Sequence, residues 1–172
     1  MSDPETMTLD TITVRATSDW RLVHRLTIEF ADRVLDDEHA AREPADLAKS
    51  VYDLVRSPSN VTLQVLADGQ PAGAFLFMYE GWGIYEVHTL LQENCRGEQA
   101  IKAARKALAF IFGSSNVVKL ISYCPTNHPE VLVFARRAGF RPAGYSTRPW
   151  VQNGVRHGLR KVELTRKDYL CQ

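Results

Sequence analysis

The sequence has few cysteines, and its longest hydrophobic run is far too short to cross a membrane. Only three cysteines occur, Cys95, Cys124 and Cys171, and an odd number excludes a fully paired disulfide framework. Neither these cysteines nor the histidines have the spacing of a zinc site. We therefore expect no bound metal and no membrane segment, and we expect free thiols in a reducing cytoplasm.

Repeats, linkers and low-complexity segments are also lacking. The 172 residues are 45% hydrophobic and 24% charged, which is the composition of a globular domain. The acidic opening MSDPETMTLD resembles neither a secretory signal nor a transit peptide. The sequence predicts a flexible segment at 1–10 and a single domain at 11–172.

Charge is unevenly distributed along the chain, although the net charge is only +1. Residues 1–50 carry six basic and eleven acidic side chains, whereas residues 141–172 carry seven basic and two acidic ones. Two interpretations stay open. The basic end is either a strand pair that forms salt bridges to the acidic half, or a surface for a nucleic acid or a phosphorylated ligand.

The pattern of apolar residues predicts, in order, a strand, two helices, three strands, a helix, a strand, a helix and two strands. Helical spacing occurs from about Ser18 to Val34, again from Pro44, then after Gly97, and finally from Asn127 to Gly139. Asn127 has the position of an N-cap, and Glu130 three residues later would complete a capping box.

Strand patterns occur at 11–18, 60–67, 71–80, 84–91, 117–125, 143–152 and 155–165. The run at 71–80 is almost continuously apolar, so we expect it to be buried on both faces. Asn153-Gly154 predicts a type I′ turn between the last two strands. The order predicts an α/β fold: a mixed central sheet of about seven strands with helices on both faces.

The stretch from His88 to Phe112 is a strand, a short polar turn and a helix. A helix start offers unpaired N–H groups and partial positive charge to a phosphate. Gly97 allows close backbone approach, and Arg96 adds a guanidinium. Taken alone, the stretch fits an ordinary connection as well as a phosphate site.

The strand at 84–91 places Glu86 and His88 on one face with Ile84 and Leu90. Three roles are open for the two polar residues: a histidine packed in the core, a carboxylate in a cross-sheet salt bridge, or a catalytic base. Their shared face favours a functional role, because a buried carboxylate needs a compensating partner.

Three segments resemble the Gcn5-related N-acetyltransferase (GNAT) superfamily, which uses acetyl-CoA. TVRATSDWRLVHRL is similar to its opening strand and helix, and LLQENCRGEQAIKAARKAL resembles its pyrophosphate motif. NHPEVLVFARRAGFRPAG resembles its last motif, in which an Asn stands twelve residues before a Gly-Phe pair, as Asn127 does before Gly139. The resemblance covers about residues 11 to 165. The segment HTLLQE, the following Arg-Gly turn and helix, and the later CPTN resemble a divergent branch often met in phage and prophage genomes.

The resemblance implies a V-shaped opening between the fourth and fifth strands that holds acetyl-CoA. The backbone of Leu90 and Leu91 would pair with the pantetheine arm, and Asn127 would meet the arm from the other side. The chain departs from the family motif where Gln99 and Ile101 occupy two positions that are usually small. The remaining implied cofactor contacts are Arg96, Gly97, Glu98, Gln99, Ala100, Ile101 and Phe134.

The reaction implied by the resemblance is direct attack of an amine on the thioester. Glu86 or His88 would act as the base, and a backbone N–H near Leu90 would stabilise the oxyanion. The family usually has a tyrosine at the position of Phe134. Tyr123 and Tyr145 are either substitutes that protonate the thiolate or packed residues of the sheet. Cys124 is either a nucleophile or, without an identified partner, a small buried hydrophobe.

Three functions follow from these considerations. The first is an N-acetyltransferase for a small-molecule or peptide amine. The second is a GNAT-fold protein that binds acyl-CoA with impaired catalysis, and the third is a nucleic-acid-directed acyltransferase. Arg148, Trp150 and Arg156 near the last hairpin either contact an acceptor or a nucleic acid, or belong to an ordinary surface hairpin. We expect a monomer or homodimer.

Overall fold

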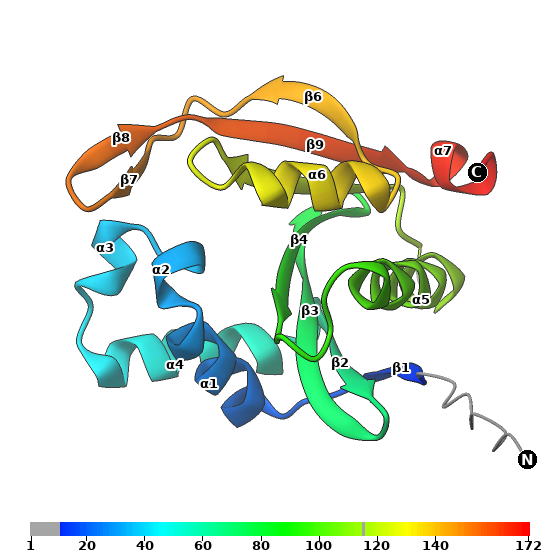
Figure 1. Ribbon diagram of the computed structural model, residues 1–172, viewed down its shortest axis with the longest axis horizontal. Coiled ribbons are helices and arrows are strands. Elements are labelled where there is room, and N and C mark those ends of the chain that lie inside the picture. Colours follow the sequence, from blue (N-terminus) through cyan, green and yellow to red (C-terminus); the bar gives the residue numbers. More distant parts are fainter. Residues whose placement is uncertain (1–10, 115) are drawn as a thin grey trace, which may run out of the picture.

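The computed structural model describes residues 11–114 and 116–172. Seven of the described strands form one sheet with the order β1-β2-β3-β4-β5-β9-β6, and β7 and β8 form a small separate sheet. Figure 1 shows how the two sheets are arranged. The large sheet comprises β1 (Ile12–Ala16), β2 (Val61–Ala67), β3 (Gln70–Gly81), β4 (Ile84–Leu91), β5 (Lys119–Pro125), β6 (Arg141–Tyr145) and β9 (Leu159–Thr165). The small sheet comprises β7 (Trp150–Gln152) and β8 (Val155–His157).

Strands β4 and β5 form the one parallel pair of the large sheet, and they stay together only briefly. Their register runs from Ile84↔Lys119 to Glu86↔Ile121, and the other neighbours in the sheet are antiparallel. Just beyond this pairing, Ser122 Oγ donates to the Val87 carbonyl at 2.9 Å. The pairing of β4 with β5 ends there, and the two strands separate. This leaves an opening between them, where a V-shaped opening was expected.

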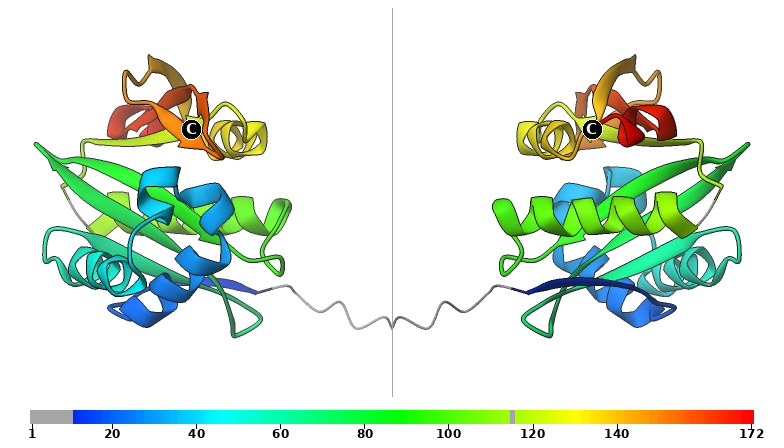
Figure 2. Two further views of the ribbon diagram at one scale, coloured as in Figure 1. Left: turned by 90° about the vertical axis from the view of Figure 1, so that its left-hand side faces the viewer. Right: turned by 90° about the vertical axis from the view of Figure 1, so that its right-hand side faces the viewer.

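Helices cover both faces of the sheet, as Figures 1 and 2 show. On one face α1 and α4 pack through Leu22, Leu26 and Val51 against Leu76 and Leu90 of the sheet. On the other face lie α5 and α6. The helices are α1 (Trp20–Glu29), α2 (Ala31–Val34), α3 (Asp37–Ala40), α4 (Pro44–Arg56), α5 (Glu98–Ser114), α6 (Pro129–Arg137) and α7 (Arg166–Leu170).

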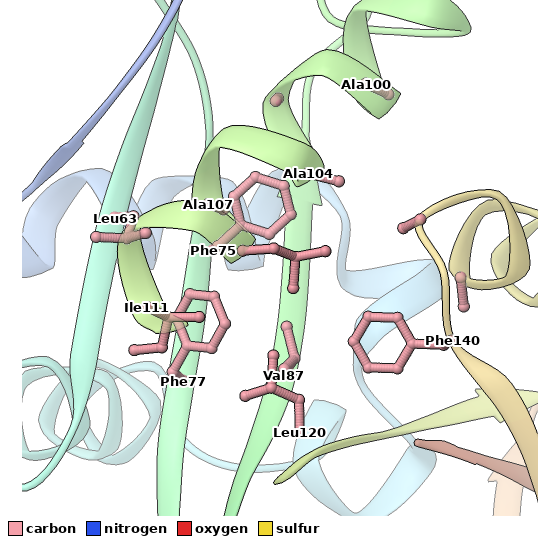
Figure 3. Close-up of a cluster of buried hydrophobic side chains, with 14 of the residues drawn as sticks. Leu63, Phe75, Phe77, Val87, Ala100, Ala104, Ala107, Ile111, Leu120 and Phe140 are labelled. Atoms are coloured by element: carbon pink, nitrogen blue, oxygen red, sulfur yellow. The ribbon is translucent and has the colours of Figure 1, made fainter. Parts of the chain in front are cut away.

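The larger hydrophobic core lies between α5 and the sheet (Figure 3). Small residues on α5, including Ala100, Ala104 and Ala107, let the helix approach Phe75 and Phe77 closely. Strand β3 is buried on both faces from Ala72 to Phe77, which confirms the interpretation of its continuous apolar run. The core therefore fixes α5, and with it the turn that precedes α5.

The predicted fold class and the order of its main elements are confirmed. The first helix begins after Asp19, whose Oδ1 accepts from the N–H groups of Arg21 and Leu22 at 3.1 and 3.2 Å. It ends at Glu29, and the separate short helix α2 follows where the first helix was expected to continue to Val34. The short helix α3 was not predicted. The predicted flexible segment at 1–10 lies outside the described residues.

Two local predictions about the C-terminal third are wrong. The N-cap of α6 is His128 and not Asn127, and no side chain caps this helix, so the expected capping box with Glu130 is absent. The last hairpin is not one continuous pair, because β6 and β9 pair with each other while β7 and β8 form the separate sheet. Its turn does have the expected type, since Asn153 and Gly154 have φ of 52° and 74°.

Candidate active site

The opening between β4 and β5 is part of a cavity of about 1440 Å³ that reaches both faces of the sheet. On the α5 and α6 side its walls include Gly97, Ala100 and Phe134. On the α1 side they include Glu86 and His88. A ligand threaded through the sheet would thus contact the turn before α5 and the polar face of β4.

The turn before α5 has the features of an anion site. Gly97 has φ of 54°, a left-handed conformation that disfavours other residues. Arg96 lies with its guanidinium carbon 5.7 Å from the centre of the Phe30 ring, and both side chains line the cavity. Because the first N–H groups of a helix lack helical partners, the turn supplies donors and a cation to one end of the cavity.

The structure separates the predicted residues of this turn into two groups. Arg96, Gly97, Ala100 and Ile101 line the cavity. Glu98 and Gln99 do not: Glu98 is exposed and forms an ion pair with Arg137. Of the two departures from the family motif, only Ile101 therefore narrows the opening.

The backbone of β4 offers hydrogen bonds to the opening at every second residue. The Val87 carbonyl faces β5, since it accepts from Ser122, and the register with β3 is regular from Tyr85 to Leu91. The N–H and C=O groups of Thr89 and Leu91 therefore face the opening, and those of Leu90 face β3. The expectation for Leu91 fits this geometry, and so does an oxyanion donor near Leu90, since Thr89 and Leu91 flank that residue. The backbone groups of Leu90 itself face β3 and are therefore poorly placed to pair with a ligand arm.

Glu86 and His88 form a pair on the groove side of β4. Glu86 Oε1 lies 3.0 Å from His88 Nε2, and the side chains are 21% and 46% exposed respectively. This exposure excludes the interpretation of His88 as a packed core residue. Burial raises the pKa of Glu86, but the hydrogen bond and charge of His88, with a contribution from Arg148, outweigh it and lower the pKa. Glu86 is thus an ionised carboxylate that holds the imidazole.

Tyr123 of β5 lies near this pair and lines the same cavity. Burial, followed by the charges of Glu86 and Glu80, raises the pKa of its phenol despite the opposing charge of Arg148. The phenol therefore stays protonated at neutral pH and can donate. Phe134, which has the position of the usual tyrosine, also lines the cavity, whereas Tyr145 is 66% exposed and does not.

Two other predicted candidates lie outside the opening. Cys124 is buried in the core, and burial raises the pKa of its thiol to about 11, so it is a packed residue and not a nucleophile. Asn127 is not among the residues lining the cavity. Its Nδ2 donates to Gln152 Oε1 at 2.7 Å, and the predicted contact with a ligand arm therefore has no support in this geometry.

Two residues near the groove escaped the sequence analysis. Asp36 is buried at the start of α3, and its Oδ1 lies 2.6 Å from His39 Nδ1. Both line the cavity. The spacing of an Asp three residues before a His is that of a capping residue, and it was the one available signal for this pair. Arg148 and Trp150, which were named as acceptor contacts, line the cavity, and Arg156 does not.

Three of the seven basic residues in the C-terminal segment 141–172 are engaged within the fold. Arg141 lies near Glu163 and Asp168, Arg160 stacks over Tyr145, and Arg166 donates to backbone carbonyls. The ion pairs of Arg141 thus lie within the C-terminal segment and not with the acidic N-terminal half, as one interpretation held. Among residues 11–114 and 116–172, no helix is long and apolar enough to cross a membrane, and no group of His, Cys, Asp and Glu could hold a metal ion.

Comparison with solved structures identifies the fold. A spermidine N-acetyltransferase from Vibrio cholerae, in complex with CoA and spermine, superposes with a TM-score of 0.76 at 16% identity over 92% of this chain and 98% of that chain. A chimera of the Vibrio cholerae enzyme and hSSAT gives 0.77 at 17% identity, covering 94% and 99% of the two chains.

The chain has the GNAT fold. RimL, a ribosomal L7/L12 alpha-N-protein acetyltransferase in complex with CoA, is also similar, with a TM-score of 0.72 at 15% identity over 90% of this chain and 94% of that one. No protein-family model and no curated protein matches the sequence. The GNAT fold is thus evident from the arrangement of the chain, and the phage-type branch stays a prediction.

Proposed function

We propose that this GNAT-fold protein is an N-acetyltransferase that transfers an acetyl group from acetyl-CoA to an amine. The observation that carries the proposal is the single cavity that connects Arg96 and Gly97 with Glu86 and His88. The two structural neighbours named with CoA are both N-acetyltransferases. In this chain, Arg96 and Gly97 could bind the cofactor at one end of the cavity, and Glu86 and His88 could receive the amine at the other.

The cofactor end fits a diphosphate on an extended arm. Arg96 and the start of α5 would bind the phosphates. The N–H and C=O groups of Thr89 and Leu91 would pair with the arm, because β5 has separated from β4 there. Leu91 lies five steps along β4 from Glu86. At a strand rise of about 3.3 Å per residue, an arm bound along β4 therefore extends roughly 16 Å from Leu91 to the Glu86–His88 pair. Ala100 and Ile101 would form the apolar floor at the phosphate end.

The acceptor end can move the protons that the reaction requires. The substrate ammonium loses a proton to His88, which Glu86 orients, either directly or through a water. The amine nitrogen then attacks the thioester carbonyl, forming the C–N bond, while the inward N–H of Thr89 or Leu91 is the candidate donor to the oxyanion. The C–S bond breaks, and the departing thiolate takes the proton of Tyr123. The attacking nitrogen, which still carries one proton more than the amide, gives that proton to the resulting Tyr123 phenolate. Products are the acetamide and CoA.

The acceptor is defined here only as an amine. The neighbours act on different amines by their names, a polyamine in one case and a protein N-terminus in the other. Tyr123 in the cavity argues against the alternative of an impaired acyl-CoA-binding protein, since it replaces the phenol missing at Phe134. A nucleic-acid acceptor has less support, because Arg141, Arg160 and Arg166 are engaged within the fold.

Calorimetry with acetyl-CoA and CoA, followed by thiol release with a panel of amines, tests this function. We expect binding, and release of CoA only when an amine is present. Arg96→Ala raises the Kd for CoA at least about tenfold, the usual effect of losing a charged hydrogen bond. Arg105→Ala is the matched control, since Arg105 is exposed on α5 outside the cavity.

The absence of CoA binding would refute the proposal, and binding without turnover would favour the impaired protein. Light scattering checks the expected monomer or homodimer. One structural neighbour, a spermidine N-acetyltransferase from Vibrio cholerae, is described as dodecameric. The cytoplasmic location likewise stays a prediction.

A further inference from the structure

Arg148 presents an unengaged guanidinium to the groove. Its backbone N–H donates to Ser146 Oγ at 3.0 Å, but its guanidinium forms no hydrogen bond or ion pair with any residue in the described part of the chain. Arg148 lines the cavity and is exposed to it. Its five N–H donors are therefore available to a ligand.

The two carboxylates whose pKa values the charge of Arg148 helps to lower, Asp36 and Glu86, already have histidine partners. Burial raises the pKa values of Asp36 and Glu86 most strongly, yet both are lowered overall, and the charge of Arg148 contributes to each. Each carboxylate is held by a histidine: Asp36 by His39 at 2.6 Å and Glu86 by His88 at 3.0 Å. The cation thus lies within the field of two carboxylates without being paired to either.

Trp150 adds an unsatisfied donor to the same wall. Its indole Nε1 is buried and has no hydrogen-bond partner among the described residues. The side chain lines the cavity, and its strand β7 is held in place by Gln152. A buried N–H without a partner costs free energy. Because this atom is closed to solvent, a ligand oxygen recovers that free energy only when the Trp150 side chain turns toward the cavity.

We propose that this groove binds the carboxylate of an amino-acid acceptor between Arg148 and Trp150 Nε1, with the amine of the same molecule directed to Glu86 and His88. The substrate class is then an amine that carries a carboxylate, which deepens the acetyltransferase function and rests on it. A planar carboxylate offers two oxygens, which match one guanidinium and one indole N–H.

A phosphate is the other oxyanion that these donors could bind, and it suits the site less well. A dianion would lie near the charges of Asp36 and Glu86, and it would meet only one cation. The carboxylate carries a single charge and needs fewer donors. Acetate and inorganic phosphate are therefore the two simple probes that distinguish a carboxylate site from a phosphate site.

The test compares amino acids with their decarboxylated amines in the full-length protein. Suitable pairs are lysine and cadaverine, histidine and histamine, and tyrosine and tyramine, with kcat/KM measured for each member. We expect the amino acid to be the better acceptor in at least one pair. Arg148→Gln lowers that preference at least about tenfold, because a charged hydrogen bond is lost. Arg156→Gln on the same hairpin lies outside the cavity and leaves the preference unchanged.

Indole N–H spectra provide a second readout that needs no turnover. The Trp150 signal is the one that disappears in Trp150→Phe. Acetate and the preferred amino acid should shift it in the wild type, the decarboxylated amine should not, and Arg148→Gln should weaken the shift. If CoA is not released with any amine, the acetyltransferase function fails while this titration still decides the carboxylate site. An equal preference for both members of every pair, or a larger shift with phosphate than with acetate, would overturn the proposal.

Discussion

Asn127 Nδ2 donates to Gln152 Oε1 across 2.7 Å, and this bond joins the loop before α6 to strand β7. The same Gln152 oxygen lies 3.1 Å from His128 Nε2. The side-chain Nε2 of Gln152 donates to the carbonyls of Asp32 and Leu35 at 2.8 and 3.1 Å. One buried side chain therefore connects α2 with the C-terminal half across the groove, as the proximity of α3 and β7 in Figure 1 shows.

Replacing Gln152 with alanine should loosen this connection. We expect Gln152→Ala to lower the free energy of unfolding by about 3 kcal/mol, since several buried polar groups lose their partners together. Hydrogen exchange should also become faster around residues 32–37. Chemical denaturation measures the first effect, and Gln70→Ala, at an exposed position, is the control that should change stability little. Equal stability of the two variants would contradict the role assigned to Gln152.

The Glu86–His88 pair predicts how stability depends on pH. Burial raises the pKa of Glu86, but His88 and Arg148 bring it below the ordinary value of 4.5 in the folded state. The unfolded chain therefore takes up the proton first as the pH falls, so the stabilisation by Glu86 is complete above about pH 4.5 and is lost below it.

Glu86→Gln should accordingly lower stability at neutral pH by about 1 kcal/mol, and this difference should shrink as the pH falls below 4.5. Denaturant titrations at a series of pH values measure it, with Glu38→Gln as an exposed control. A difference that grows toward acidic pH would mean that the folded-state pKa of Glu86 is raised.

Tyr123 should affect the chemical step more than binding. If its phenol protonates the leaving thiolate, Tyr123→Phe lowers kcat by about 100-fold, the lower end of the usual contribution of a general acid, with little change in the KM for acetyl-CoA. Phe134→Tyr, added to that variant, should recover part of the activity because Phe134 lines the same cavity. Tyr145→Phe is the control, as Tyr145 lies outside the cavity. A loss in Tyr145→Phe as large as that in Tyr123→Phe would exclude the assigned role.

The sequence predicted those features that follow from local pattern. Alternation along 84–91 placed Glu86 and His88 on one face, and the Asn153-Gly154 dipeptide predicted its turn. The continuous apolar run of β3 predicted burial on both faces. Each of these depends on neighbours in the chain, which a sequence displays directly.

Features that depend on distant partners were not predictable in this way. Asn127 had the spacing of an N-cap, but its amide binds Gln152, which is 25 residues away. Leu90 was expected to face the ligand, yet which backbone groups face outward depends on the register with β3. The Asp36–His39 pair gained a place in the groove only through packing of α3 beside β7.

Cysteine reactivity should distinguish the buried thiols from the exposed one. Cys95 and Cys124 are buried, and burial raises the pKa of both thiols, to about 11 for Cys124, while Cys171 is exposed. At pH 8 about one Cys124 thiol in a thousand would be ionised even if reagents reached it. We expect one fast-reacting thiol in the native protein and three after unfolding, measured with a chromogenic disulfide. Cys171→Ser should remove the fast phase, which also clears the background for measuring CoA release. Fast labelling that persists in Cys171→Ser would show that the core around Cys95 or Cys124 opens readily.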